Sequence, residues 1–550
     1  MRDSLSVELL GPDGAQDDPN LFEYFVEEQS KFNKSILVGR WGTGKTSLLL
    51  WRTRHLEKLF RENSRTESRP WYIEEEDLNI VEISNAFEAH SGSTSRRYKI
   101  FKEMWESEIY LRAITILCNI HSFHKDKLCE NSWNFLSAKQ IHKKIPQGIW
   151  NNAGIIINLL ARESKYANVF KEIINVYNDI RSPEVVDSIY ICCKELKDKN
   201  LPLPVISIEP IETPRSEAES SDGLANDLIA SLITCWYESF RRERPGNLIS
   251  VNVSVPWHRY FPERTAFPHR IPRNVNTIYW EKPRLRSFIE KRLSWQRDQY
   301  RPPRRHKGRE EVDDVWGVYF PETVENLVCT NIHERNEWSF DYLCRHSSWR
   351  ARDLLVLTRE SILNYCVKSG IEPEEFFIGE YQVDEETIRE TTRDLCEEIA
   401  EQRITEYMRR YNYKKMRPDV FRGLTSPLRR EALFSQIADE FGANTKLKEE
   451  NILEELWDSE IIGVCIEFPF TGEKARFRNW YGPDCIRELK GVNYGEGDLD
   501  AVGFLFRGMT KGAGGIIKIL SVFDNYRLIF NPTFHEYLGI KVNSEYPIGL

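Results

Sequence analysis

The sequence contains no cysteine pattern that indicates a metal site. Its eleven cysteines form no C-x-x-C motif, and the adjacent Cys192 and Cys193 fall within a helical pattern. Cysteines of this kind are typical of reduced packing residues in cytosolic proteins. We therefore expect free thiols and no cysteine-bound metal.

Long hydrophobic runs are also absent. No stretch reaches the roughly eighteen apolar residues of a membrane-spanning helix. Residues 1–30 contain acidic residues such as Asp3, Glu8 and Asp13, but not the apolar core of a signal peptide. These absences predict a cytoplasmic protein without a membrane span.

Positive charge is not in excess. The 76 Lys and Arg residues are outnumbered by 85 Asp and Glu residues, which gives a net charge of −9. This balance argues against a generally cationic surface for nucleic acid, although it is compatible with a local basic patch. The sequence also has no recognisable nuclease metal cluster, nucleophile elbow or Cys/His pair. We therefore expect a partner protein to carry any effector chemistry.

The most specific feature that is present is the segment SILVGRWGTGKTSLL at residues 35–49. Its first apolar residues predict a buried strand, and the apolar residues after Thr46 recur at helical spacing. The turn between them fits G-x-x-x-x-G-K-[ST], which binds phosphate through backbone N–H groups at a helix N-terminus. The alternative is a glycine-rich turn with a structural role only.

This motif predicts a site for ATP and Mg²⁺. Lys45 is expected to contact the β- and γ-phosphates, and the Thr46 hydroxyl is expected to ligate Mg²⁺. The expected nucleotide-binding residues are Gly39, Arg40, Trp41, Gly42, Thr43, Gly44, Lys45, Thr46 and Ser47.

The chain, at 550 residues, is too long for a single core. Strand patterns alternate with helical connections in its first half, which predicts an α/β fold with a parallel sheet and ligands at the carboxyl ends of the strands. The expected strands are 36–38, 78–84, 203–214, 247–255 and 275–280, with a short helix at 21–29 and a longer one at 220–240. The expected parts are an N-terminal extension (1–19), an ATPase domain (20–282) with a helical insertion (about 97–199), a helical lid (283–380), a charged connecting helix (381–416) and a C-terminal domain (417–550).

Two acidic residues follow the third expected strand. Glu209 stands at its carboxyl end and Glu212 three residues later. Hydrolysis of ATP needs a carboxylate for the Mg²⁺ shell and a group that orients water. We expect Glu212 and Glu209 to be the catalytic carboxylates, with Glu209 also serving the metal, although Asp is the usual residue at the first position. The alternative is that both carboxylates cap the next helix or end the strand at the surface.

The order of these patterns resembles the P-loop ATPases of the AAA+ and STAND type. The resemblance covers roughly residues 20–370 and includes VISIEPIE, ISVNVSV, NTIYWEKPRLRSFIEKRL and WRARDLL. It is closest to bacterial members that are similar to origin-recognition ATPases and end in a winged helix. The resemblance implies an ATPase that assembles into oligomers or acts beside an effector, including in anti-phage defence.

The resemblance also implies further site residues. A polar residue on the fourth strand senses the γ-phosphate, for which Asn252 is the best match and Ser254 the second. A lid arginine that contacts nucleotide corresponds to Arg350 or Arg352. The arginines Arg270 and Arg273, before the fifth strand, are candidates to reach the nucleotide of a neighbouring subunit.

The C-terminal part has the pattern of a winged helix. REALFSQIADEFG (430–442) and KEENILEELWDSEIIGV (448–464) predict helix, turn, helix and strand, and YRLIFNPTFHEYLGI (526–540) predicts a late strand and a short helix. The second helix holds the acidic residues Glu449, Glu450, Glu454, Glu455 and Asp458. Acidic residues would repel DNA phosphates, so we favour a protein contact over DNA for this helix.

Two basic stretches keep nucleic acid as a candidate partner. The first, at 296–309, contains Arg301, Arg304 and Arg305, and the second, at 408–417, places Arg409 and Arg410 beside tyrosines. Cations interleaved with aromatics suit phosphate contacts and base stacking. A solvated loop and a charged helix end are the alternatives.

Three functions are therefore open from the sequence. The first is an Mg-ATP-dependent conformational switch that acts with a partner effector. The second is an ATP-gated DNA-binding initiator or regulator. The third is an ATP-bound structural scaffold that does not hydrolyse its nucleotide, because glutamate replaces the usual aspartate at position 209.

Overall fold

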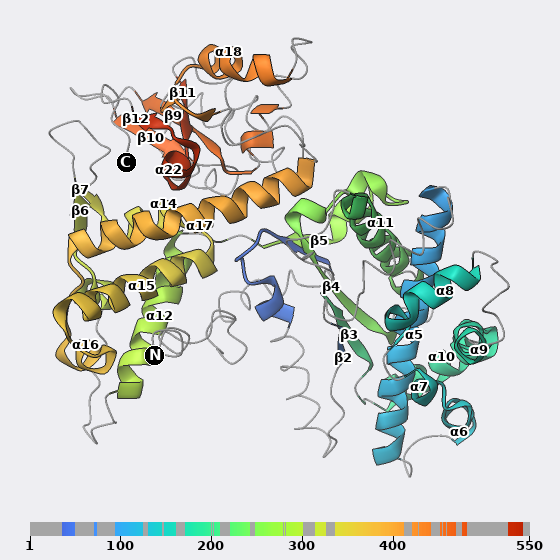
Figure 1. Cartoon of the computed structure of the whole chain (residues 1–550). Coiled ribbons are helices and arrows are strands. Elements are labelled where there is room, and N and C mark those ends of the chain that lie inside the picture. The colour runs from blue at the N-terminus through green and yellow to red at the C-terminus, as the bar shows by residue number, and fades with distance from the viewer. Residues whose placement is uncertain are drawn as a thin grey trace. The chain divides into compact units, whose positions relative to one another are not determined.

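The protein is described here by a computed structural model. It falls into a first compact unit within Gln16–Ile278 and a second within Tyr279–Leu550 (Figure 1). The structure describes residues 36–49, 71–73, 94–124, 130–145, 148–160, 171–199, 201, 203–209, 220–241, 248–278, 280, 282–300, 314–325, 336–411, 421–426, 428–441, 452–453, 455–457, 459–468, 476–480 and 526–542.

A parallel five-stranded sheet forms the centre of the first unit. Its order is β2-β3-β4-β1-β5, and each neighbouring pair runs parallel. The strands are β1 (Ile36–Gly39), β2 (Trp71–Ile73), β3 (Val205–Ile208), β4 (Ser250–Pro256) and β5 (Val275–Thr277). This confirms the predicted α/β core with a parallel sheet.

The second strand differs from the sequence prediction. The sheet contains β2 at Trp71–Ile73, which the sequence analysis did not identify as a strand. The strand predicted at 78–84 and the short helix predicted at 21–29 lie outside the described residues. The strands predicted around β1, β3, β4 and β5 are confirmed.

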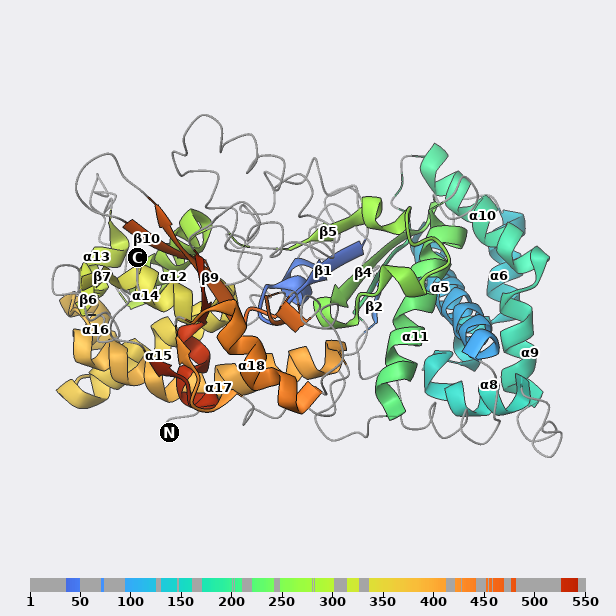
Figure 2. The same cartoon turned by 90° about the horizontal axis from the view of Figure 1, so that it is seen from above.

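The two faces of the sheet have different chemistry. One face contributes its apolar side chains to a buried core shared with helices α5 (Thr94–His124) and α11 (Ser220–Cys235), and Figure 2 shows both helices beside the sheet. That face includes Ile36, Val38, Ile206, Ile208, Val251, Val253 and Val255. Because side chains alternate along a strand, the other face carries Ser207, Asn252 and Ser254, which are also buried.

The described residues of the predicted insertion form helices joined by short turns and loops. After α5 come α6 (Glu130–Lys139), α7 (Ile141–Lys144), α8 (Ala153–Leu160), α9 (Lys171–Ile180) and α10 (Pro183–Asp198). Within α5, Arg112 Nε lies 2.5 Å from Glu108 Oε1 in a buried ion pair. Glu108 Oε2 also accepts a hydrogen bond from the Ile149 backbone N–H, which ties the loop around Gly148 to α5. Gly148 has φ 92°, and a Cβ there would lie 2.6 Å from Arg112 Nη2. Only glycine fits this close approach.

The first part of the second unit is mainly helical. Its longest helix, α17, packs along α15, as Figure 1 also shows. The elements are α12 (Lys282–Tyr300), α13 (Val315–Tyr319), β6 (Thr323–Glu325), β7 (Asn336–Trp338), α14 (Ser339–His346), α15 (Ala351–Ser369), α16 (Pro373–Gly379) and α17 (Glu385–Tyr411). The antiparallel pair β6–β7 was not predicted.

The C-terminal part combines helices with small sheets. A three-stranded antiparallel sheet has the order β10-β9-β11, and β8 pairs with β12. The elements are β8 (Thr425–Ser426), α18 (Arg430–Phe441), β9 (Ile462–Phe468), β10 (Arg476–Trp480), β11 (Tyr526–Phe530), α22 (His535–Leu538) and β12 (Lys541–Val542). This confirms the late strand and short helix. Of the five acidic residues predicted on the second helix of this part, only Glu455 is described.

Two further expectations can be compared with the described residues. None of the helices there is long and apolar enough to cross a bilayer. Cys118, Cys192, Cys193, Cys235, Cys344, Cys366 and Cys396 form no disulfide within the described part of the chain.

Candidate functional site

The glycine-rich turn follows β1 directly and leads into a helical segment that begins at Lys45. Gly42 and Gly44 adopt φ of 75° and 89°, in the region that side chains disfavour. At Gly39, a Cβ would lie 2.6 Å from Thr43 Oγ1. The backbone conformation therefore favours glycine at 42 and 44, and the close approach of the Thr43 side chain favours it at 39.

The turn is held together by the carbonyl oxygen of Arg40. Thr43 Oγ1 donates to it at 2.8 Å and Lys45 Nζ at 2.9 Å. Lys45 is 4% exposed. Because a lysine ammonium has three donor hydrogens, this internal bond does not exclude a second contact with a phosphate. The turn therefore presents a buried, oriented cation at the end of β1.

The position of the turn in the sheet favours ligand binding. β1 lies between β4 and β5, and the sheet continues beyond β4 with β3 and β2. In open parallel sheets, ligands bind at the carboxyl ends of the strands where the strand order changes direction. The turn occupies that point in this sheet.

The structure brings together the two residues expected to serve the metal. Glu209 follows β3, and the Thr46 hydroxyl donates a hydrogen bond to Glu209 Oε1. Hydroxyl and carboxylate oxygens are the ligand type that Mg²⁺ prefers. Glu212, the other expected catalytic carboxylate, lies outside the described residues. No cluster of three or more His, Cys, Asp or Glu side chains that could hold a metal occurs among the residues with described positions.

Strand register distinguishes the two candidate sensor residues. Ile208 pairs with Val253, so Glu209 lies level with Ser254, whereas Asn252 lies level with Ser207. Both candidates are buried, and in the described structure neither the Asn252 amide nor the Ser254 hydroxyl has a hydrogen-bond partner. A buried polar group without a partner costs roughly 1–3 kcal/mol. Such groups, of which Ser254 is level with Glu209, suit a polar ligand.

Two aromatic residues that the sequence analysis did not identify also contact the turn. The Arg40 guanidinium carbon lies 4.5 Å from the ring centroid of Trp257, and the Trp41 ring meets His258 edge-on at 5.1 Å. Trp257 and His258 follow β4 immediately. The only signal in the sequence was an aromatic run, PWHRY, after the fourth strand.

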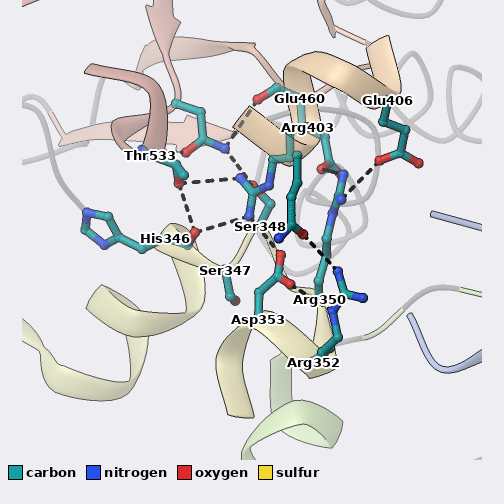
Figure 3. Close-up of polar contacts among 12 residues, drawn as sticks. His346, Ser347, Ser348, Arg350, Arg352, Asp353, Arg403, Glu406, Glu460 and Thr533 are labelled. Carbon is teal, nitrogen blue, oxygen red and sulfur yellow. Dashed lines mark hydrogen bonds and ion pairs between the residues drawn. The ribbon is translucent and has the colours of Figure 1, made fainter. Parts of the chain in front are cut away.

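Arg350 occupies a buried ionic cluster in the second unit. Its Nη1 lies 3.1 Å from Glu406 Oε2 and its Nη2 lies 3.0 Å from Glu460 Oε2 (Figure 3). Burial disfavours the charged form, but the attraction of Glu406 and Glu460 outweighs it and raises the pKa of Arg350. Arg352 lies beside it, more exposed, and donates to Gln402 Oε1 at 3.1 Å. This arrangement gives Arg350 a structural role, and the contact of either arginine with nucleotide stays a prediction.

Arg403, on α17, connects this cluster to further residues of the second unit. Its Nη1 donates to Ser348 Oγ at 2.5 Å, and its Nη2 donates to the His346 carbonyl at 3.2 Å and lies 3.4 Å from Asp353 Oδ2 (Figure 3). Thr533 Oγ1 donates to the same carbonyl at 2.9 Å. Arg403 Nη1 also donates to Thr533 Oγ1 at 3.4 Å. α17 is therefore tied both to the turn before α15 and to the segment that follows β11.

The backbone within this cluster is also unusual. Ser348, Trp349 and Glu460 have φ of 46°, 60° and 63°. Residues other than glycine rarely adopt this left-handed region, at a cost on the order of 1 kcal/mol each. The buried polar contacts of Ser348 and Glu460 described above hold this backbone in place.

The remaining predicted site residues are partly described. Arg270 precedes the 3-10 turn Ile271–Asn274 and Arg273 lies in it. Both are exposed, and neither guanidinium forms an ion pair within the described part of the chain. Arg301, Arg304 and Arg305 lie outside the described residues, as do the side chains of Arg409 and Arg410 at the end of α17. The nucleic-acid contacts expected for these five arginines stay predictions.

Comparison with known proteins gave no relatives. No protein-family model, no curated protein and no solved structure matches the chain.

Proposed function

We propose that the chain is a P-loop ATPase of the AAA+ or STAND type whose first unit binds Mg-ATP and acts as a conformational switch. The observation that carries the proposal is the hydrogen bond from Thr46 to Glu209. It joins the end of the glycine-rich turn to the strand-end acid, which are the two features expected to surround a nucleotide-bound magnesium ion.

Each residue of this site has a proposed task. Backbone N–H groups of the turn and the Lys45 ammonium hold the phosphates. The Thr46 hydroxyl and the Glu209 carboxylate position the metal, which when bound offsets charge on the phosphates. Ser254 and Asn252 respond to the terminal phosphate. Ser254 lies level with Glu209, and Asn252 lies two residues earlier on β4. Glu212 is proposed to orient the attacking water.

The output of the switch is proposed to pass to a partner. The resemblance to AAA+ and STAND ATPases favours oligomer assembly or a separate effector protein, including one in anti-phage defence. We also propose that the C-terminal part, with its helices and antiparallel sheet, is a winged-helix-like domain that contacts protein.

Titration calorimetry with Mg-ATP tests the proposal. Lys45→Ala should weaken binding at least tenfold, because it removes a charge-assisted contact of roughly 1.5–3 kcal/mol. Lys99→Ala is the matched control, since its side chain is 78% exposed on α5. Absence of binding by the unaltered protein would reject the proposal. A particle mass that increases with ATP would favour a switch that assembles, whereas binding without hydrolysis or assembly would favour a scaffold.

A further inference from the structure

The end of β4 lies beside the start of the glycine-rich turn. β1 and β4 run parallel, and Gly39 pairs with Pro256 at their ends. The chain therefore leaves both strands at the same level. The 3-10 turn Trp257–Arg259 follows β4 there, next to Arg40 and Trp41.

The contacts involve Arg40 and Trp41, two of the four positions that the phosphate-binding motif leaves open. The Arg40 guanidinium stacks over the Trp257 ring at 4.5 Å, and Trp41 packs against His258 with an interplanar angle of 80°. A cation over a tryptophan face is attracted by the ring electrons. Both contacts are made by side chains that the glycine pattern does not require.

Arg40 is also the residue that fixes the lysine. Its carbonyl oxygen accepts hydrogen bonds from both Thr43 and Lys45. A displacement of Arg40 would move this acceptor and with it the Lys45 ammonium. The place of the phosphate-binding cation thus depends on what holds Arg40.

The turn after β4 is itself anchored. Arg259, which is 1% exposed, donates from Nη1 to Asn226 Oδ1 on α11 at 3.3 Å. α11 packs along α5 in the main core of the unit. Trp257 and His258 therefore extend from a rigid support.

We propose that Trp257 and His258 are positioning residues for the phosphate-binding turn. They hold Arg40 and Trp41, and through the Arg40 carbonyl they set the position of Lys45. The assignment of Mg-ATP as the ligand rests on the proposed function. The effect of Trp257 and His258 on the turn can be measured without any ligand.

Three variants distinguish the contribution of the Trp257 aromatic face from that of apolar packing alone. Trp257→Leu keeps apolar bulk but removes the aromatic face, Trp257→Phe keeps a face, and Arg40→Met keeps length but removes the charge. Hydrogen exchange of peptides covering residues 39–49 is measured without nucleotide. Calorimetry with Mg-ATP is measured in parallel. A peptide from α5 reports whether each variant is folded.

We expect Trp257→Leu and Arg40→Met each to speed exchange in the turn and to weaken Mg-ATP binding roughly 2- to 30-fold. The double variant, Trp257→Leu with Arg40→Met, should bind Mg-ATP no more weakly than whichever single variant binds it more weakly. Trp257→Phe should retain most of the wild-type affinity. Exchange in α5 should not change.

Two results would overturn the inference. One is that Trp257→Leu shows the same hydrogen exchange in the turn and the same Mg-ATP affinity as the wild-type protein. The other is that Trp257→Phe and Trp257→Leu lose Mg-ATP affinity equally. If the unaltered protein binds no Mg-ATP but the exchange differences appear, the proposed function fails and the positioning role stands.

Discussion

The Thr46 hydroxyl donates a hydrogen bond to the Glu209 carboxylate, although the two residues are 163 positions apart in the chain. Thr46 belongs to the helix after β1 and Glu209 follows β3, so β4 separates their strands in the sheet. The contact thus spans the carboxyl edge of the sheet at the place where a metal is expected.

Thr46→Val should selectively remove the magnesium-dependent part of ATP binding. Valine keeps the shape of threonine but cannot ligate a metal or donate to Glu209. We expect roughly a tenfold or greater loss of affinity with Mg²⁺ and a smaller loss in EDTA. Calorimetry in both buffers measures this difference. Thr405→Val, which removes a hydroxyl bonded only to its own helix, is the control, and equal losses in both buffers would contradict the metal assignment.

Asn252 and Asn531 should respond in opposite directions to replacement by leucine. Both are fully buried, but the Asn252 amide has no hydrogen-bond partner in the described structure, whereas Asn531 Nδ2 donates to Ser348 Oγ at 2.6 Å. Removing an unsatisfied group is neutral or stabilising, while breaking a satisfied network costs about 1–3 kcal/mol.

Thermal unfolding without nucleotide measures both asparagine variants. Asn252→Leu should unfold at or above the wild-type temperature and lose the stabilisation that Mg-ATP gives. Asn531→Leu should unfold at a lower temperature. A clear destabilisation of Asn252→Leu together with normal ATP binding would assign Asn252 a purely structural role.

Arg350→Met and Arg352→Met should differ strongly in stability. Arg350→Met leaves the buried carboxylates of Glu406 and Glu460 without their cation, and such a change costs about 3–5 kcal/mol. Arg352 is half-exposed, so its replacement should cost less than about 1 kcal/mol. Denaturant unfolding of the second unit measures both. Wild-type stability of Arg350→Met with weakened ATP binding would instead favour the nucleotide contact predicted from the sequence.

The second unit should lose stability in mild acid through two histidines. Burial and the nearby Arg345 lower the pKa of His346 well below its usual value, with Arg403 and His535 adding to the effect. Burial, and to a lesser degree Arg345, lowers the pKa of His535 to about 4, although its contact with the Phe530 carbonyl opposes the shift.

The direction of the pH dependence follows from these shifts. Unfolded histidine has a pKa of about 6.5, so below that pH the unfolded chain binds protons that the folded chain does not. Stability from these groups should be complete above pH 6.5 and should decrease as the pH falls towards 4. Denaturant midpoints at pH 7.5 and 5 measure this loss, and His346→Gln with His535→Gln should reduce it. Equal midpoints in the unaltered protein would contradict the assignment.

The sequence predicted elements whose signals are local. β1, β3 and β4 are short apolar or β-branched runs bounded by turn residues, and α5 and α11 have helical spacing. β2 has only three residues, and its place depends on pairing with β3, where Trp71 lies opposite Ile206. That pairing is a tertiary contact, which no local pattern could predict.

In the candidate site, too, local signals could be predicted from the sequence and tertiary contacts could not. The glycines, Lys45 and Thr46 form one continuous motif, but the contact with Glu209 depends on strand order. The resemblance favoured Asn252 over Ser254, whereas the register places Ser254 level with Glu209. The partners of Arg350 could not be predicted, because Glu406 and Glu460 come from elements far along the chain.

The strand order also has a consequence for how the protein is made. β1 is synthesised at residues 36–39, yet both strands that bond to it begin only at residues 250 and 275. At about 5–20 residues per second, the ribosome leaves this apolar segment unpaired for tens of seconds. Chaperone protection or early collapse onto the nascent helices is then needed to keep it from wrong partners.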